Sequence, residues 1–140
     1  MSKKDKLLNN LYNCTYTRLN VSKLQGVGVF AIKDIKKGTD PFKLPNKNRY
    51  KTIKCTTNEL SNLDPEIKKM ITDFLEPDGR VFHIPENGLN SLDITFYLNH
   101  SLSNNLGIVD KDGDEYYGFV TLRDIKKGEE LLINYDDYKE

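Results

Sequence analysis

The chain has 140 residues, a length that allows one hydrophobic core and is short for two domains. Hydrophobic residues make up 37% and charged residues 30%, which is the composition of a folded globular protein and excludes a disordered chain. The 21 basic and 21 acidic residues cancel, so net charge offers no general attraction for nucleic acid or an anionic membrane, and no apolar run reaches membrane-spanning length.

The cysteine and histidine content indicates neither a disulfide-stapled secreted domain nor a metal site. Cys14 and Cys55 are too few for a disulfide framework, and with only His83 and His100 beside them the chain has no zinc-ligand spacing. The basic start at residues 3–6 is not followed by an apolar run of signal-peptide length. We therefore expect an intracellular protein with no bound metal.

Short strands bounded by turn residues dominate the predicted secondary structure. In chain order, strands are predicted at residues 15–20, 49–55, 81–85, 106–109, 116–122 and 131–134. Thr56 and Glu59 form a capping-box pattern that predicts a short helical turn. A helix is predicted at about 64–75, because Asp64 suits the N-cap, Pro65 suits the first helical position, and apolar residues follow at three-four spacing. The expected fold class is mainly β, with several small sheets and one short amphipathic helix.

One pattern occurs twice, at residues 28–38 and 118–128. In each copy a short apolar strand runs into the turn Asp-Ile-Lys-Lys-Gly, which is identical in both. The closing glycine can take the positive φ that a lysine cannot adopt cheaply. Two distant copies are too few for a solenoid, so the repeat predicts a β-rich domain whose two halves use the same turn.

The acidic segment 110–115 has the alternating carboxylates of a calcium-binding loop but not its register. An EF-hand loop needs Gly in its sixth position and Glu in its twelfth, whereas anchoring on Gly113 puts Ile108 first and Phe119 last. Asp-Gly is also a common hairpin signal. We therefore predict a solvated hairpin turn and assign no ion.

The most polar stretch to follow an apolar run begins with Asn99, His100 and Ser101. Buried amides and imidazoles need hydrogen-bond partners, so these side chains either satisfy backbone groups of the core or face a ligand. His100 and Ser101 do not form a hydrolase pair, because neighbouring side chains on extended backbone point to opposite faces. The structural and the ligand-binding interpretations both stay open at this point.

Three segments together resemble the motifs of SET-domain protein-lysine methyltransferases. Asn99-His100-Ser101 followed by Asn105 resembles the family's N-H-S-x-x-P-N, and residues 128–135, ending at Tyr135, resemble its G-E-E-L-x-x-D-Y. Gly26-Val27-Gly28 is similar to its N-terminal G-x-G loop. The order and separation agree with the family, whose small viral and bacterial members are closest in size. The resemblance implies a single domain over residues 1–140, with a motif-supported core at about 19–138 and an N-terminal extension at 1–14.

What the resemblance implies for the fold is a SET-type arrangement of small sheets with a C-terminal pseudoknot, a rare exception to unthreaded connections. The strand ending at Tyr135 would thread past the loop that carries Asn99. S-adenosyl-L-methionine is the implied cofactor. Its methionine part would lie against Gly26, Val27 and Gly28, its amino group on the Asn99 side chain, and its adenine on the His100 backbone.

The same resemblance makes Tyr135 the catalytic residue, as an orienter of the substrate lysine amine rather than a general base. Backbone carbonyls near Leu98 would hold the methyl group through weak C–H···O contacts. The implied walls of the lysine channel are Tyr97, Tyr116, Tyr117, Ile133 and Tyr138. Each of these tyrosines is alternatively an amphipathic residue at the edge of the core.

Departures from the family pattern favour a second hypothesis, a SET-like module without activity. Asn104 replaces the usual Pro, and Ile133 stands at the Phe or Tyr position that influences how many methyl groups are added. Zinc-binding cysteines that follow the domain in many members are absent, so Tyr138 or a second chain in a homodimer would complete the channel. The alternative to a methyltransferase is an inactive SET-like module that binds a peptide or protein.

The implied partner is a protein or basic peptide, such as a histone tail, attracted by acidic residues that include Asp136, Asp137 and Glu140. Direct nucleic-acid and membrane binding are not expected. The implied location is the nucleus or cytoplasm, of a host cell if the protein is a viral or bacterial effector.

Overall fold

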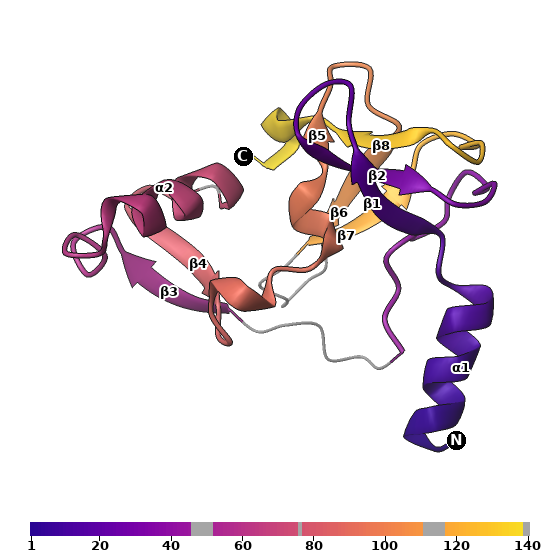
Figure 1. Cartoon of the computed structure of the whole chain (residues 1–140), viewed down its shortest axis with the longest axis horizontal. Helices are drawn as coiled ribbons and strands as arrows, with labels where there is room; N and C mark the ends of the chain where they lie inside the picture. The colour runs from indigo at the N-terminus through magenta and orange to yellow at the C-terminus, as the bar shows by residue number, and fades with distance from the viewer. Residues whose placement is uncertain (46–51, 76, 111–116, 139–140) are drawn as a thin grey trace.

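The computed structural model describes residues 1–45, 52–75, 77–110 and 117–138. Within these ranges the elements are α1 Lys3–Asn13, β1 Thr17–Val21, β2 Val27–Ala31, β3 Thr52–Thr56, α2 Pro65–Phe74, β4 Val81–Pro85, the 3-10 helices η1 Leu89–Ser91 and η2 Ile94–Tyr97, β5 Asn99–His100, β6 Leu106–Asp110, β7 Tyr117–Thr121, β8 Glu130–Ile133 and the 3-10 helix η3 Tyr135–Tyr138 (Figure 1). No helix in these ranges is long and apolar enough to cross a membrane.

A four-stranded sheet of order β1-β2-β8-β5 places strands from the N-terminal and C-terminal parts of the chain side by side (Figure 1). β1 and β2 form an antiparallel hairpin, and β2 pairs antiparallel with β8 through Val29 and Leu131. β5 runs parallel to β8, with Asn99 opposite Leu132. All three motif-bearing segments therefore meet in this one sheet. The threading of the C-terminal segment into a pseudoknot stays a prediction.

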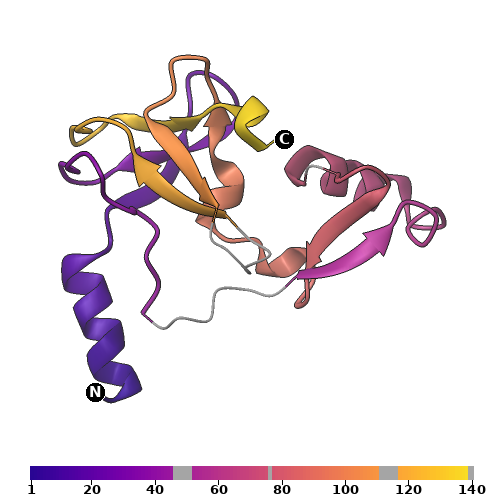
Figure 2. The ribbon, with the colours of Figure 1, turned by 180° about the vertical axis from the view of Figure 1, so that it is seen from behind.

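Two hairpins form the other sheets, β3 with β4 and β6 with β7. Both views show α2, β3 and β4 as a lobe beside the main body (Figures 1 and 2). The predicted strand at 81–85 has the observed bounds, and the β6–β7 pairing confirms the predicted hairpin strands, although its turn at 111–116 lies outside the described residues. Helix α2 is confirmed as well. Its Asp64 N-cap accepts a hydrogen bond from the Glu66 N–H at 2.8 Å.

The expected arrangement of several small sheets is confirmed, whereas the class is mixed α/β rather than mainly β, because the described residues contain two α-helices where one was expected. The missed helix, α1, begins at a capping box: Ser2 Oγ accepts from the Asp5 N–H at 3.1 Å, and Asp5 Oδ2 accepts from the Ser2 N–H at 3.4 Å. No residue of α1 is buried, and the helix projects from the main body (Figures 1 and 2). The signal that the sequence offers for this helix is the local capping box and not a core-facing apolar stripe.

The main core lies between the four-stranded sheet and the β6–β7 hairpin. Its fully buried side chains include Val29, Leu106, Leu131 and Ile133. A smaller cluster of Ile71, Leu75 and Phe82 fills the lobe formed by α2, β3 and β4. The sheet that carries the motif segments is thus supported by the larger of the two cores.

The repeated Asp-Ile-Lys-Lys-Gly turns bind each other reciprocally. Ile35 and Ile125, each 1% exposed, exchange backbone hydrogen bonds of 2.7 and 2.8 Å. The Asp124 carboxylate accepts from the Lys37 N–H at 2.8 Å, and the Asp34 carboxylate accepts from the Lys127 N–H at 2.9 Å. The closing glycines have φ of 85° and 92°. The repeat is therefore a two-sided clasp that joins the end of β2 to the start of β8.

Loss of either aspartate from this clasp is expected to destabilise the fold by the same amount. Asp34→Ala and Asp124→Ala each remove one acceptor for a backbone N–H, which is expected to lower the free energy of unfolding by about 1 kcal/mol. The matched variants Asp34→Asn and Asp124→Asn keep the accepting oxygen and should lose less. Urea unfolding of the four variants measures this, and unequal effects of the two Ala variants would argue against a symmetric clasp.

Candidate functional site

The side chain of Asn99, 8% exposed at the start of β5, is the centre of the site. Its amide nitrogen Nδ2 donates to the carbonyl oxygens of Gln25 and Val27, at 3.1 and 3.3 Å, and to Glu130 Oε2 at 2.8 Å. These contacts join the G-x-G loop, β5 and β8. The sequence left open whether Asn99 satisfies core backbone groups or faces a ligand. In the structure it hydrogen-bonds to the backbone of the loop that is expected to bind a ligand.

Glu130, at the start of β8, extends this network to the other end of the loop. Its Oε1 accepts from the Ser22 hydroxyl at 2.7 Å, across 108 residues of sequence. Ser22 Oγ in turn accepts from the N–H groups of Leu24 and Gln25 at 3.0 and 3.4 Å. Loop backbone, serine, carboxylate and Asn99 amide therefore form one connected network, which sequence reasoning missed. A glutamate in an otherwise apolar strand was the available signal for it.

The two glycines of the loop serve different purposes. Gly26 has φ of 49°, a left-handed conformation that other residues adopt at a cost, but a Cβ there would meet no atom within 4 Å. Gly28 does not have a positive φ, but a Cβ on it would collide with the Glu130 carboxylate. That Cβ would lie 2.9 Å from Glu130 Cδ and 3.0 Å from Asn99 Nδ2. Gly26 allows the turn, and Gly28 leaves room for the network.

His100 contacts Tyr135 rather than the loop. Its Nδ1 accepts from the backbone N–H of Tyr135 at 2.9 Å, and the two rings lie 5.0 Å apart between centroids. An accepting Nδ1 places the imidazole proton on Nε2. The His100 side chain therefore fixes the residue at which β8 turns into η3, and this leaves its backbone for the role that the family resemblance implies.

The Tyr135 hydroxyl donates to the Leu98 carbonyl oxygen at 2.6 Å, immediately before Asn99. The side chain is partly buried, with 41% of the residue exposed, and burial raises the pKa of Tyr135 above its ordinary value of 10.0. Because a buried phenolate is disfavoured, the group is a neutral phenol at physiological pH. Its proton points at Leu98, and its oxygen retains lone pairs for a second partner.

Of the predicted channel residues, the structure describes the side chains of Ile133 and Tyr97 and not those of Tyr116, Tyr117 and Tyr138. Ile133 is fully buried in the main core, and the half-buried Tyr97 packs edge-on against Phe74 of α2, with 5.5 Å between ring centroids. Tyr116 lies outside the described residues, while Tyr117 and Tyr138 are placed by their backbone only, in β7 and η3. The structure therefore brings Tyr97 close to the lobe formed by α2, β3 and β4, and places Ile133 among core side chains.

Asn105 is a further buried polar residue, 2% exposed, and it clasps β8 from the loop after β5. Its Nδ2 donates to the Glu130 carbonyl oxygen at 2.9 Å, and its Oδ1 accepts from the Leu132 N–H at 2.8 Å. The Leu132 carbonyl oxygen also accepts from the Asn105 N–H at 3.2 Å. Asn105 therefore hydrogen-bonds to the backbone of β8 in the way that a neighbouring strand would. The motif position that the sequence analysis used for recognition has a structural role here.

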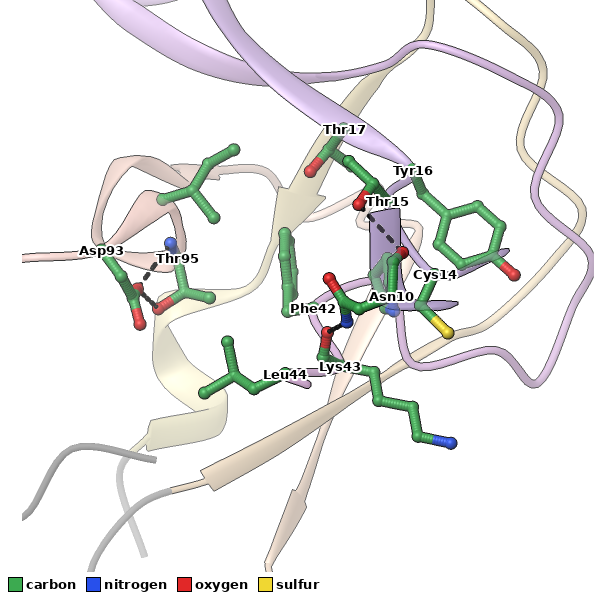
Figure 3. A pocket seen from close by; sticks show the side chains of 12 residues that line it. Asn10, Cys14, Thr15, Tyr16, Thr17, Phe42, Lys43, Leu44, Asp93 and Thr95 are labelled. Carbon is green, nitrogen blue, oxygen red and sulfur yellow. Dashed lines mark hydrogen bonds between the residues drawn. The ribbon is translucent and has the colours of Figure 1, made fainter. Parts of the chain in front are cut away.

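A cavity of about 240 Å³ lies elsewhere, beneath the end of α1 (Figure 3). It is lined by Asn10, Cys14, Thr15, Tyr16, Thr17, Pro41, Phe42, Lys43, Leu44, Asp93, Ile94 and Thr95. The Asn10 amide spans it to the Lys43 carbonyl oxygen at 2.6 Å. Its lining shares no residue with the network around Asn99 and Tyr135, so this hollow is not the candidate site.

Comparisons with known proteins found a matching family model and similar solved structures. The family model described as SET domain matches residues 13–136. Among solved structures, the chain is similar to a Plasmodium falciparum protein described as a candidate histone methyltransferase, with TM-score 0.53 and 21% identity over 86% of this chain and 93% of that one.

It is also similar to a humanized mutant of the Chaetomium thermophilum Polycomb Repressive Complex 2 in an inhibitor-bound structure, with TM-score 0.61 and 19% identity, over 99% of this chain and 18% of that one. At these identities the likeness concerns the fold. A search of curated proteins found no match.

Proposed function

Because this chain belongs to the SET domain family, we propose that it transfers a methyl group from S-adenosylmethionine to the side-chain amine of a protein lysine. The observation that best supports this is the Tyr135 hydroxyl, held on the Leu98 carbonyl oxygen at 2.6 Å, one residue from the Asn99 network. A polar hydroxyl and a backbone carbonyl meet there beside a loop suited to a cationic ligand.

The residues around Asn99 fit the proposed cofactor. S-adenosylmethionine carries an ammonium group and supplies an activated methyl group when it is bound. The described contacts of Asn99 run through Nδ2, so its Oδ1 is available to accept from an ammonium, and the Glu130 carboxylate adds negative charge nearby. We therefore place the methionine part at Gly26, Val27, Gly28 and Asn99, and the adenine at the His100 backbone.

Tyr135 would act on the lysine as an acceptor. Since its own proton is used by the Leu98 carbonyl, its oxygen can accept one N–H of a neutral amine and leave the nitrogen lone pair free to react. A lysine amine has an ordinary pKa of about 10.4, and apolar surroundings favour its neutral form. The raised pKa of Tyr135 keeps the hydroxyl protonated, so it orients the amine without acting as the base.

For the substrate we propose a basic peptide, because the exposed Asp136 and Asp137 directly follow Tyr135. Asp137→Lys is expected to raise the KM for such a peptide roughly 3- to 10-fold at low ionic strength, and less at high salt, where screening weakens exposed charges. Glu86→Lys makes the same charge change at an exposed position after β4 and serves as the matched control. Equal KM values for the two variants would count against an acidic docking site beside Tyr135.

The proposed activity is tested with labelled S-adenosylmethionine and, as acceptors, purified histones and a cell lysate. Label that appears on lysine with the wild-type chain and falls strongly with Tyr135→Phe supports the proposal. Titration calorimetry with S-adenosylhomocysteine measures cofactor-site binding separately. Binding without transfer would favour the alternative of a SET-like binding module, and the absence of both would overturn the enzyme proposal.

A further inference from the structure

We infer that Glu130 is a positioning residue, which fixes the end of the Asn99 amide that faces the ligand and thereby selects a ligand with a protonated amine. The inference rests on the proposed function, because the ligand considered is the amino group of an S-adenosylmethionine-like molecule. Glu130 would thus contribute to ligand recognition in addition to forming part of strand β8.

An asparagine amide has a donating and an accepting end of nearly equal size, so something must choose between its two orientations. Here the hydrogen-bond partners of the chosen end among the described residues are all acceptors: the carbonyl oxygens of the loop at 3.1 and 3.3 Å and Glu130 Oε2 at 2.8 Å. A flipped Asn99 would point its own oxygen at three oxygens, one of them charged. The acceptor end, Oδ1, is therefore directed away from the network.

The orientation of Glu130 is itself set by the loop backbone. The Ser22 oxygen receives the N–H groups of Leu24 and Gln25 at 3.0 and 3.4 Å, so its own hydrogen is left for Glu130 Oε1 at 2.7 Å. Among the described residues, the second carboxylate oxygen then accepts from Asn99 alone. From the loop N–H groups through Ser22 to Glu130, each donor therefore has one acceptor to bind. Because Gly28 has no Cβ, the Glu130 carboxylate has room beside it.

Two properties of the site follow. Asn99 presents an oxygen, which suits a donor, and the carboxylate behind it favours a donor that is positively charged. A neutral donor would gain from the oxygen alone, and a ligand without the amine would gain from neither. The network therefore contributes to affinity through the amino group of the ligand and not through its remaining parts.

The test compares two ligands in two proteins. S-adenosylhomocysteine and its analogue lacking the α-amino group are titrated by calorimetry into the wild-type chain and into Glu130→Gln. A carboxamide offers one accepting oxygen for the two donors Ser22 and Asn99, so the variant no longer holds the Asn99 amide in one orientation. We expect the affinity for S-adenosylhomocysteine to fall about 10- to 100-fold and that for the deaminated analogue less than about threefold.

Two further variants make the result specific. Ser22→Ala removes the hydroxyl bond but keeps the carboxylate, and should show a smaller loss with the same dependence on the ligand amine; it also gives the answer if Glu130→Gln folds poorly by circular dichroism. Glu129→Gln, the neighbouring carboxylate that pairs with Arg123 at 2.9 Å, should leave the preference for the amine unchanged. Wild-type chain that binds neither ligand overturns the proposed function. A preference for the amine that survives both Glu130→Gln and Ser22→Ala overturns this inference alone.

Discussion

Tyr135→Phe is expected to lower kcat for lysine methylation about 100-fold while changing the affinity for S-adenosylhomocysteine less than about threefold. The variant keeps the ring and its 5.0 Å contact with His100 but removes the oxygen that would orient the amine. Single-turnover kinetics and calorimetry measure the two quantities separately. The exposed Tyr12 offers a control, because Tyr12→Phe makes the same chemical change on α1. A kcat within a factor of three of wild type would show that the hydroxyl does not position the substrate.

The pH dependence follows from the direction of the Tyr135 shift. Because burial raises the pKa of this phenol, activity should rise with pH as the substrate lysine loses its proton, with no decline caused by Tyr135 below about pH 10. The raised pKa also makes stability depend on pH: the contribution of the partly buried phenol is fully present below its ordinary pKa, and it is lost as the pH rises above that value. Tyr135→Phe should lack this alkaline loss, which alkaline unfolding monitored by circular dichroism measures.

Local signals in the sequence predicted the elements whose causes are local. Helix α2 follows from an Asp64 N-cap, Pro65 and an apolar stripe, and the pairing of β6 and β7 follows from two β-branched runs on either side of an Asp-Gly dipeptide in the sequence. The repeated turn was predicted as a shared feature, but its reciprocal pairing was not. Pairing of the two copies depends on where β2 and β8 meet, which no local pattern encodes.

The candidate site was predicted in its motif residues and missed in its supporting ones. Asn99 and the glycine loop were identified because they form a known pattern, whereas Ser22 stands 108 residues from the Glu130 carboxylate that it contacts. Gly28 was expected to lie against the methionine part of the cofactor. In the structure its missing Cβ makes room for a protein carboxylate, a contact visible only once β2 and β8 are paired.

Gly28→Ala is expected to disturb fold and site together. The added methyl group would collide with the Glu130 carboxylate, which cannot move aside without giving up Ser22 or Asn99. We expect the free energy of unfolding to fall by about 1–3 kcal/mol, as for other overpacked sites, and the affinity for S-adenosylhomocysteine to fall at least about 10-fold. Urea unfolding and calorimetry measure the two effects.

The matched control is Gly26→Ala, two residues away in the same loop. Its cost comes only from the left-handed φ of 49°, about 1–2 kcal/mol, because its Cβ would meet no atom within 4 Å. A second variant separates collision from strain: in Gly28→Ala combined with Glu130→Ala, the obstructing carboxylate is gone, so the double variant should be more stable than the sum of the two single effects predicts. The equivalent pairing of Gly26→Ala with Glu130→Ala should be additive. Additivity in both pairs would mean that Gly28 is required for its backbone and not for the room that it leaves beside Glu130.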